Sequence, residues 1–264
     1  MLLKRHLAAA GMAAAALTLV AAVLTGQPQA PAPVLHPDLA VTTVPAGGVQ
    51  AAARYGWGKV VAGDEFNYIG APDPAKWMVY NGPGHAGKGV RSPNAWKIGS
   101  GAATVTGNAY GTTGGMAAKF AAQKYGRWEV RMRTSVRDPK YHPVLLLWPN
   151  PGTTRTCPEI DYAESLTDTT VVKFNVHYAC AGPHPYQSQA ARKIDTTQWH
   201  NYAVQWSPAG ITGYIDGILW FTDRTPAHQP PGAMHQTLQL DWFPITGKAT
   251  KPSWMQIDWV RVYK

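Results

Sequence analysis

Apolar and polar residues alternate with a period of two along much of the chain after residue 55. The clearest case is the segment 126–133. Its apolar positions are Trp128, Val130 and Met132, and its polar positions are Arg127, Glu129, Arg131 and Arg133. This alternation predicts a strand with one buried face and one face in water.

Further strands are expected at similar spacing along the chain. They cover residues 102–106, 115–120, 143–148, 158–164, 171–179, 199–206, 211–215, 218–221, 235–241 and 254–263. Asp216-Gly217 predicts a tight hairpin, because both residues tolerate positive φ. Many short strands separated by turn residues predict an all-β sandwich or barrel.

The first 54 residues have a different composition. Lys4-Arg5-His6 precedes an apolar run over 7–24, which predicts a signal peptide over residues 1–30. The run is also long enough for the alternative of an uncleaved membrane anchor. Residues 31–54, rich in Ala, Pro, Val and Gly, predict a disordered linker. We expect residues 55–264 to form one folded domain, secreted or associated with the cell wall, and without membrane contact once the peptide is removed.

The formal net charge of +9 favours anionic partners, but lysine and arginine form no cluster of five or more. We therefore expect a solvated basic surface and no nucleic-acid partner. We expect the protein to be a monomer.

Candidate chemistry is concentrated in the segment Glu159-Ile-Asp-Tyr-Ala-Glu164. Glu159 and Asp161 fall on one face of the expected strand, whereas strict alternation would turn Glu164 into the core. An unpaired core carboxylate is costly, so we expect a β-bulge that returns Glu164 to the side of Glu159. Three acids on one face would push one another's pKa values apart. In the next strand, Asn175 and His177 are expected beside these acids.

The segment resembles the E-x-D-x-x-E signature of glycoside hydrolase family 16, in its laminarinase and agarase branch. The resemblance extends over about residues 56–264, through Gly126–Arg131, Leu147-Trp148-Pro149, Trp199–Trp206, Tyr214–Gly217 and Asp258–Tyr263. It implies a concanavalin A-like jelly roll of two curved antiparallel sheets and a retaining endo-glycosidase that hydrolyses a β-glucan or β-galactan. Glu159 is then the nucleophile, Glu164 the acid/base and Asp161 the residue that orients them. A glycan-binding protein without activity and a transglycosylase are the alternatives on this fold.

The departure Leu238-Gln-Leu-Asp-Trp242 distinguishes the chain from many of these relatives. Sugar rings need aromatic platforms and hydrogen-bonding side chains. The expected substrate-binding residues are His177, Asn175, Trp148, Gln239, Trp242, Arg91 and Tyr80. No cofactor is expected. Some relatives bind a structural calcium ion at a position matching Asp258. The resemblance therefore leaves a calcium-bound form as an alternative to a protein without metal.

Cys157 and Cys180 are the only two cysteines. Export to an oxidising compartment predicts that they form a disulfide. The bond would brace the strand that carries the acids.

Overall fold

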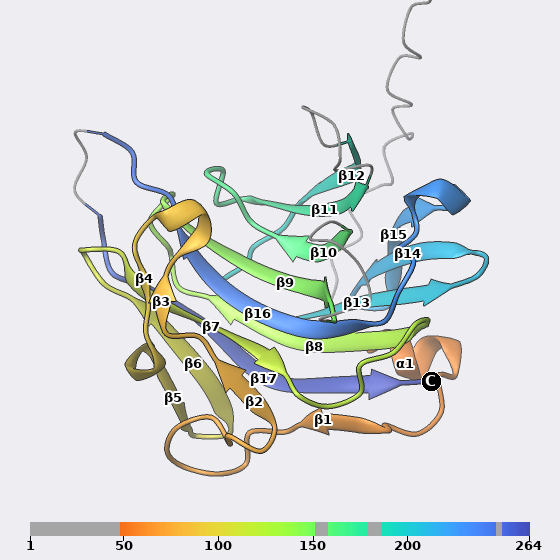
Figure 1. The fold of residues 1–264 in the computed structure, drawn as a ribbon, viewed down its shortest axis with the longest axis horizontal. Helices are drawn as coiled ribbons and strands as arrows, with labels where there is room; N and C mark the ends of the chain where they lie inside the picture. The colour runs from red at the N-terminus through yellow and green to blue at the C-terminus, as the bar shows by residue number, and fades with distance from the viewer. Residues whose placement is uncertain (1–47, 151–157, 179–185, 247–249) are drawn as a thin grey trace, which may run out of the picture. The chain divides into compact units, whose positions relative to one another are not determined.

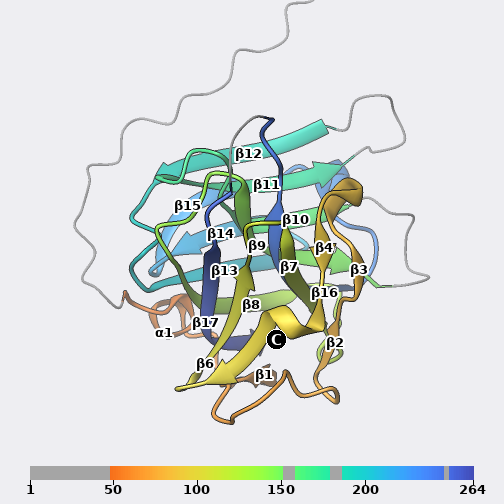
Figure 2. The same ribbon diagram turned by 90° about the vertical axis from the view of Figure 1, so that its left-hand side faces the viewer.

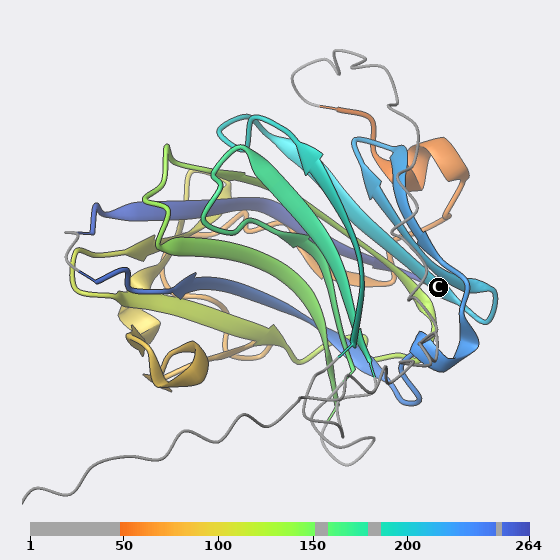
Figure 3. The same cartoon turned by 90° about the horizontal axis from the view of Figure 1, so that it is seen from above.

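The computed structural model describes residues 48–150, 158–178, 186–246 and 250–264. Within these ranges nearly all regular structure is β-strand, arranged as two sheets that lie one on the other (Figures 1 and 3). No described helix is long and apolar enough to cross a membrane. The expected all-β sandwich is confirmed.

The first sheet has nine described strands in the order β12-β11-β10-β9-β16-β7-β4-β3, with β2 paired to β7 (Figure 2). Their bounds are β2 Trp77–Val79, β3 Gly82–Pro83, β4 Val90–Arg91, β7 Thr112–Ala118, β9 Tyr141–Pro149, β10 Glu159–Glu164, β11 Val171–Tyr178, β12 Tyr186–Lys193 and β16 Met234–Trp242. Every pair is antiparallel except β4 with β7, which run parallel. The two expected antiparallel sheets are thus present, with one short parallel pair at this edge.

The second sheet has eight described strands in the order β15-β14-β13-β8-β17-β6-β5, with β1 paired to β17. Their bounds are β1 Ala62–Asp64, β5 Trp96–Gly99, β6 Ala102–Gly107, β8 Gly126–Thr134, β13 His200–Ser207, β14 Gly210–Ile215, β15 Ile218–Asp223 and β17 Ser253–Tyr263. Asp216 and Gly217 join β14 to β15 with φ values of 51° and 69°, which confirms the expected hairpin.

The core lies between the sheets, where the alternating apolar positions meet. Trp128, Val130 and Met132 of β8 are buried there with Ile160 and Tyr162 of β10. The short strands β1 to β5 and the strand β12 had no period-two pattern strong enough to predict them. Among the described connections there are three short 3-10 helices, η1 His85–Gly87, η2 Pro93–Ala95 and η3 Pro226–His228.

The N-terminal boundary of the domain differs from the expectation. Residues 51–55 form the helix α1 (Ala51–Tyr55), and Ala51 and Ala52 pack against Ala203, Tyr214 and Tyr263 of the second sheet. The last four residues of the expected linker therefore belong to the folded domain. The segments expected to be a signal peptide and a linker lie, up to residue 47, outside the described residues and stay predictions.

The helix α1 also changes the outer face of β8. Glu129, expected in water, is fully buried and accepts hydrogen bonds from the backbone N–H groups of Ala51 (2.6 Å) and Ala52 (3.2 Å). Alternation along β8 had assigned the side chain to the correct face. It could not show that α1 covers that face.

Candidate active site

Strand β10, which carries the three acids, contains the expected β-bulge. Glu159 pairs with His177 and Asp161 with Asn175, but Glu164 pairs with Lys173, so the register shifts between Asp161 and Glu164. Ile160, Tyr162 and Ala163 all face the core and are at most 1% exposed. The extra residue thus keeps Glu164 on the same side as the other two acids.

The three acids line a cleft of about 630 Å³ on the nine-stranded sheet. Six of the expected substrate-binding residues line the same cleft: Tyr80, Arg91, Trp148, Asn175, His177 and Gln239. They come from β4, β9, β11 and β16 and from the segment after β2. Segments far apart in the sequence therefore meet at this cleft.

Asp161 is fixed by a chain of hydrogen bonds that begins on β12. Gln187 Nε2 lies 3.0 Å from His177 Nδ1, and His177 Nε2 lies 2.8 Å from Asp161 Oδ2. An amide nitrogen only donates, so His177 Nδ1 accepts and its Nε2 carries the hydrogen toward Asp161. The other Asp161 oxygen, Oδ1, is buried without an N–H donor among the described residues. The carboxyl groups of Glu159 and Asp161 lie close together, so the pair shares a proton.

Glu164 is held from the neighbouring strand. Asn175 Nδ2 donates to Glu164 Oε2 at 2.5 Å, and Lys173 lies opposite Glu164 on β11. Both residues line the cleft. The second carboxylate is therefore oriented by different partners from those that orient Asp161.

The electrostatics of the cluster disfavour full ionisation. Burial, followed by the charge of Asp161, raises the pKa of Glu159 from 4.5 to about 9. Burial also raises the pKa of Asp161 and of Glu164, and for Asp161 the charge of Glu164 adds to it. Three carboxylates so close cannot all be charged, so the cluster retains protons near neutral pH. A nucleophilic Glu159 must be ionised, which requires that the proton it shares with Asp161 move to Asp161.

A second polar network lies farther along the cleft. Arg91 donates from Nη2 to Asp241 Oδ1 at 2.7 Å and also to Gln239 Oε1. The guanidinium lies over the Tyr80 ring, 5.3 Å from its centroid. Arg91 is thereby held in one orientation by an ion pair, an amide and an aromatic face.

Trp242 does not line the cleft, so its expected role as a subsite wall is wrong. Trp242 is on the same face of β16 as Leu238 and Leu240, which are in the core. Its ring packs against that core. A Cβ on Gly111 would lie 2.5 Å from the indole, so the ring fills the space that this glycine leaves. The indole N–H donates to Thr250 Oγ1 at 3.3 Å.

Asp241 and Phe243 line the cleft in its place. Asp241 follows Gln239 by two positions, so the period of β16 could have indicated it. Phe243 lies beyond the strand, where no period applies. Its ring stacks on His142 at 4.4 Å and contacts His85 at 5.1 Å between centroids. Lys173, two positions before Asn175, is on the face that alternation along β11 predicts, whereas His85 and Gln187 line the cleft without a sequence indication.

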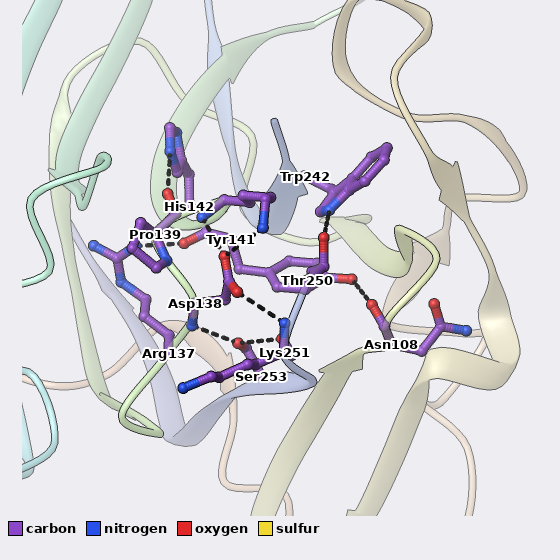
Figure 4. A network of polar contacts seen from close by, with 11 residues as sticks. Asn108, Arg137, Asp138, Pro139, Tyr141, His142, Trp242, Thr250, Lys251 and Ser253 are labelled. Carbon is purple, nitrogen blue, oxygen red and sulfur yellow. Dashed lines mark hydrogen bonds and ion pairs between the residues drawn. The ribbon is translucent and has the colours of Figure 1, made fainter. Parts of the chain in front are cut away.

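A buried network behind the cleft supports these elements (Figure 4). Arg137 donates to the carbonyl oxygens of Tyr141 at 2.5 Å and of Leu166 at 2.6 Å, and Leu166 lines the cleft. Asp138 accepts from the backbone N–H of Lys251 at 2.8 Å. The turn before β9 is thus tied to the segment after β10 and to the start of β17.

Glu159, Asp161 and His177 bring three possible metal ligands within 4.8 Å of one another. Their hydrogen bonds already account for this grouping. At the expected calcium position, Asp258 Oδ2 lies 3.2 Å from Arg131 Nε. A guanidinium competes with a cation for that oxygen, so the residues fit calcium poorly. Cys157 and Cys180 lie outside the described residues, and their disulfide stays a prediction.

Comparisons with known proteins bear on this geometry. The chain is 30% identical to a β-glucanase of Bacillus amyloliquefaciens over 53% of its own length and 59% of that protein. It is 25% identical to a keratan-sulfate endo-1,4-β-galactosidase of Sphingobacterium multivorum, over 78% of its own length and 55% of that protein. It therefore spans little more than half the length of these two curated relatives.

Among solved structures, the laminarinase from Rhodothermus marinus superposes with a TM-score of 0.68 and 24% identity. The match covers 78% of this chain and 97% of that one. This likeness shows the jelly-roll fold. The sequence profile described as Glycosyl hydrolases family 16 matches residues 89–261, which include β10 and the cleft residues of β16. The chain therefore belongs to glycoside hydrolase family 16.

Proposed function

We propose that this protein is a secreted, retaining endo-glycosidase that hydrolyses a polysaccharide of the β-glucan or β-galactan type. The observation that carries the proposal is the bulge in β10, because it brings Glu159, Asp161 and Glu164 to one face in the cleft. The similarity to a β-glucanase and to a keratan-sulfate endo-1,4-β-galactosidase supports both substrate types. The apolar run after Lys4-Arg5-His6 supports export.

In the first step, the Glu159 carboxylate attacks the anomeric carbon while Glu164 donates its proton to the leaving oxygen. A covalent glycosyl-enzyme forms and the glycosidic bond breaks. Asp161 takes the shared proton, which leaves Glu159 ionised without a change in the charge of the pair. In the second step, Glu164 accepts a proton from water, and the resulting hydroxide displaces Glu159 from the sugar.

The cleft residues would position the polymer on either side of this centre. Trp148 and Phe243 offer aromatic faces to the apolar C–H faces of sugar rings. Arg91, Gln239 and Asp241 offer donors and acceptors for hydroxyl groups. This arrangement fits an extended neutral chain.

The stereochemistry of the product tests the mechanism. We expect NMR at early times to show retained configuration when the wild-type enzyme cleaves β-1,3-glucan, mixed-linkage glucan or agar. The inverted anomer would contradict the assignment. An absence of product from every polysaccharide that the protein binds would instead favour a glycan-binding function.

Azide separates the two glutamates. Glu159→Gly should lose activity, and azide should restore cleavage of an activated substrate with inverted product. Glu164→Ala should still form the intermediate from such a substrate, and azide should then give retained product. Glu65→Gly, which removes a half-exposed carboxylate paired with Arg261, is the control and should not respond to azide.

A further inference from the structure

A row of polar and aromatic side chains crosses the outer face of the eight-stranded sheet. On paired strands, Arg133 of β8 lies opposite Gln256 of β17, Gln256 lies opposite Thr104 of β6, and Thr104 lies opposite Lys97 of β5. Directly opposite residues share one face of a sheet. The four side chains therefore form a continuous line across four strands.

The row is ordered by its own contacts. Arg133 lies between two indoles, 4.7 Å from the Trp199 centroid and 5.6 Å from that of Trp254. Its Nε donates to Gln256 Oε1 at 2.9 Å, and Gln256 Nε2 donates to Thr104 Oγ1 at 3.1 Å. The guanidinium plane is thus fixed, and its terminal N–H groups stay at the edge of the stack.

The two cations of this row have no acidic partner in the part of the chain that the structure describes. Neighbouring arginines on the same sheet are paired with acids, Arg131 with Asp258 at 3.2 Å and Arg261 with Glu65 at 2.8 Å. Among the described residues, no ion pair involves Arg133 or Lys97. Lys97 is exposed and Arg133 is partly exposed. The helix α1 packs elsewhere on this sheet, against Ala203, Tyr214 and Tyr263.

We propose that this row is a second, non-catalytic binding site for an acidic polysaccharide. The edge of the Arg133 guanidinium pairs with one carboxylate of the polymer, and Lys97 pairs with another. The two strands carrying these residues are three strand spacings apart, roughly 14 Å, so the site needs repeating carboxylates on an extended chain. Gln256 and Thr104 face the sugar hydroxyl groups between them.

The observations favour a glycan over a nucleic acid. Nucleic-acid binding depends on the neutralisation of many phosphates, typically about 6–10. The row offers two unpaired cations, and the two indoles beside Arg133 already face its guanidinium, so they are poor platforms for bases. The row lies on the sheet opposite the cleft, so occupation does not compete with the substrate of the active site.

Polygalacturonate is a suitable probe, with a neutral β-1,3-glucan and single-stranded DNA as comparators. Binding is measured calorimetrically with the full chain carrying Glu159→Gly, so that hydrolysis does not interfere and the result is independent of the proposed activity. We expect Arg133→Gln to weaken polygalacturonate binding about tenfold, as for a charge-assisted pair. Lys97→Gln should weaken it about threefold, and added salt should weaken it further.

Arg224→Gln is the matched control, because it removes the same charge from an exposed arginine outside the row. Lys97 is exposed, so Lys97→Gln should fold normally. It therefore tests the row even if Arg133→Gln has a folding defect. Equal losses in Arg224→Gln and the two row variants would overturn the proposal. So would an equal weakening of neutral glucan binding by Arg133→Gln and Lys97→Gln, because neutral glucan bound in the cleft on the other sheet does not reach the row. The glycan assignment would be overturned if single-stranded DNA bound as tightly as polygalacturonate and if Arg133→Gln and Lys97→Gln weakened DNA binding to the same extent.

Discussion

The buried carboxylate of Glu129 gives the most direct test of how the N-terminal segment is held. The side chain is fully buried on β8 and accepts hydrogen bonds from the N–H groups of Ala51 and Ala52 in α1. Glu129→Gln keeps the size of the side chain and an acceptor oxygen, but removes the ionisable group. The amide nitrogen of Gln cannot accept from the second N–H group, but this loss does not vary with pH. The pH-dependent part of the difference therefore reports the buried charge.

The magnitude follows from the pKa. Burial raises the pKa of Glu129 from 4.5 to about 7, although the N–H groups of Ala51 and Ala52 oppose the shift. Between these two values the folded protein binds a proton that the unfolded chain has lost. Its free energy of unfolding therefore falls as pH rises, by about 1.4 kcal/mol for each pH unit. The loss across the interval is roughly 3 kcal/mol.

Urea denaturation at pH 5, 6, 7 and 8 measures this loss. The acids of the cleft also have raised pKa values, so the wild-type curve contains their contribution in the same direction. The difference between Glu129→Gln and the wild type removes that contribution. We expect the variant to gain stability relative to the wild type as pH rises, most of it by pH 8.

Glu65→Gln provides the control, because its side chain is 46% exposed and paired with Arg261 on the surface. Its stability should differ from that of the wild type by less than about 1 kcal/mol at every pH. Parallel stability curves for Glu129→Gln and the wild type would refute the reasoning. They would mean that the N–H groups of α1 compensate the buried charge in full.

Three further predictions concern the cleft and the catalytic strand. Trp242→Ala should lower the free energy of unfolding by about 3 kcal/mol, because it leaves a cavity beside Gly111, and unchanged stability in urea would contradict this placement. Phe243→Ala should raise the KM for polymer about tenfold through the loss of a ring platform; a change in kcat alone would argue against that role. Protein exported by its native host should contain the Cys157–Cys180 disulfide, and mass spectrometry that found two free thiols would exclude it.

The sequence determined the fold class and most long strands, because period-two burial is a local property. It also determined the bulge in β10, since Glu164 would otherwise be an unpaired carboxylate in the core. The same reasoning placed Asn175 and His177 beside the acids, because neighbouring strands bring alternate residues to one face. Each of these inferences needed only the chain within one or two adjacent strands.

Only the tertiary structure decided what covers each face. Glu129 is on the predicted face of β8, yet α1 buries it. Trp242 fills the space beside Gly111, although its type suggested a sugar platform, while Phe243 reaches the cleft from beyond the strand. Arg91 meets Asp241 across 150 positions of sequence. Alternation along a strand predicts the face on which a side chain lies. The segments that cover that face come from distant parts of the sequence, so a local pattern cannot predict them.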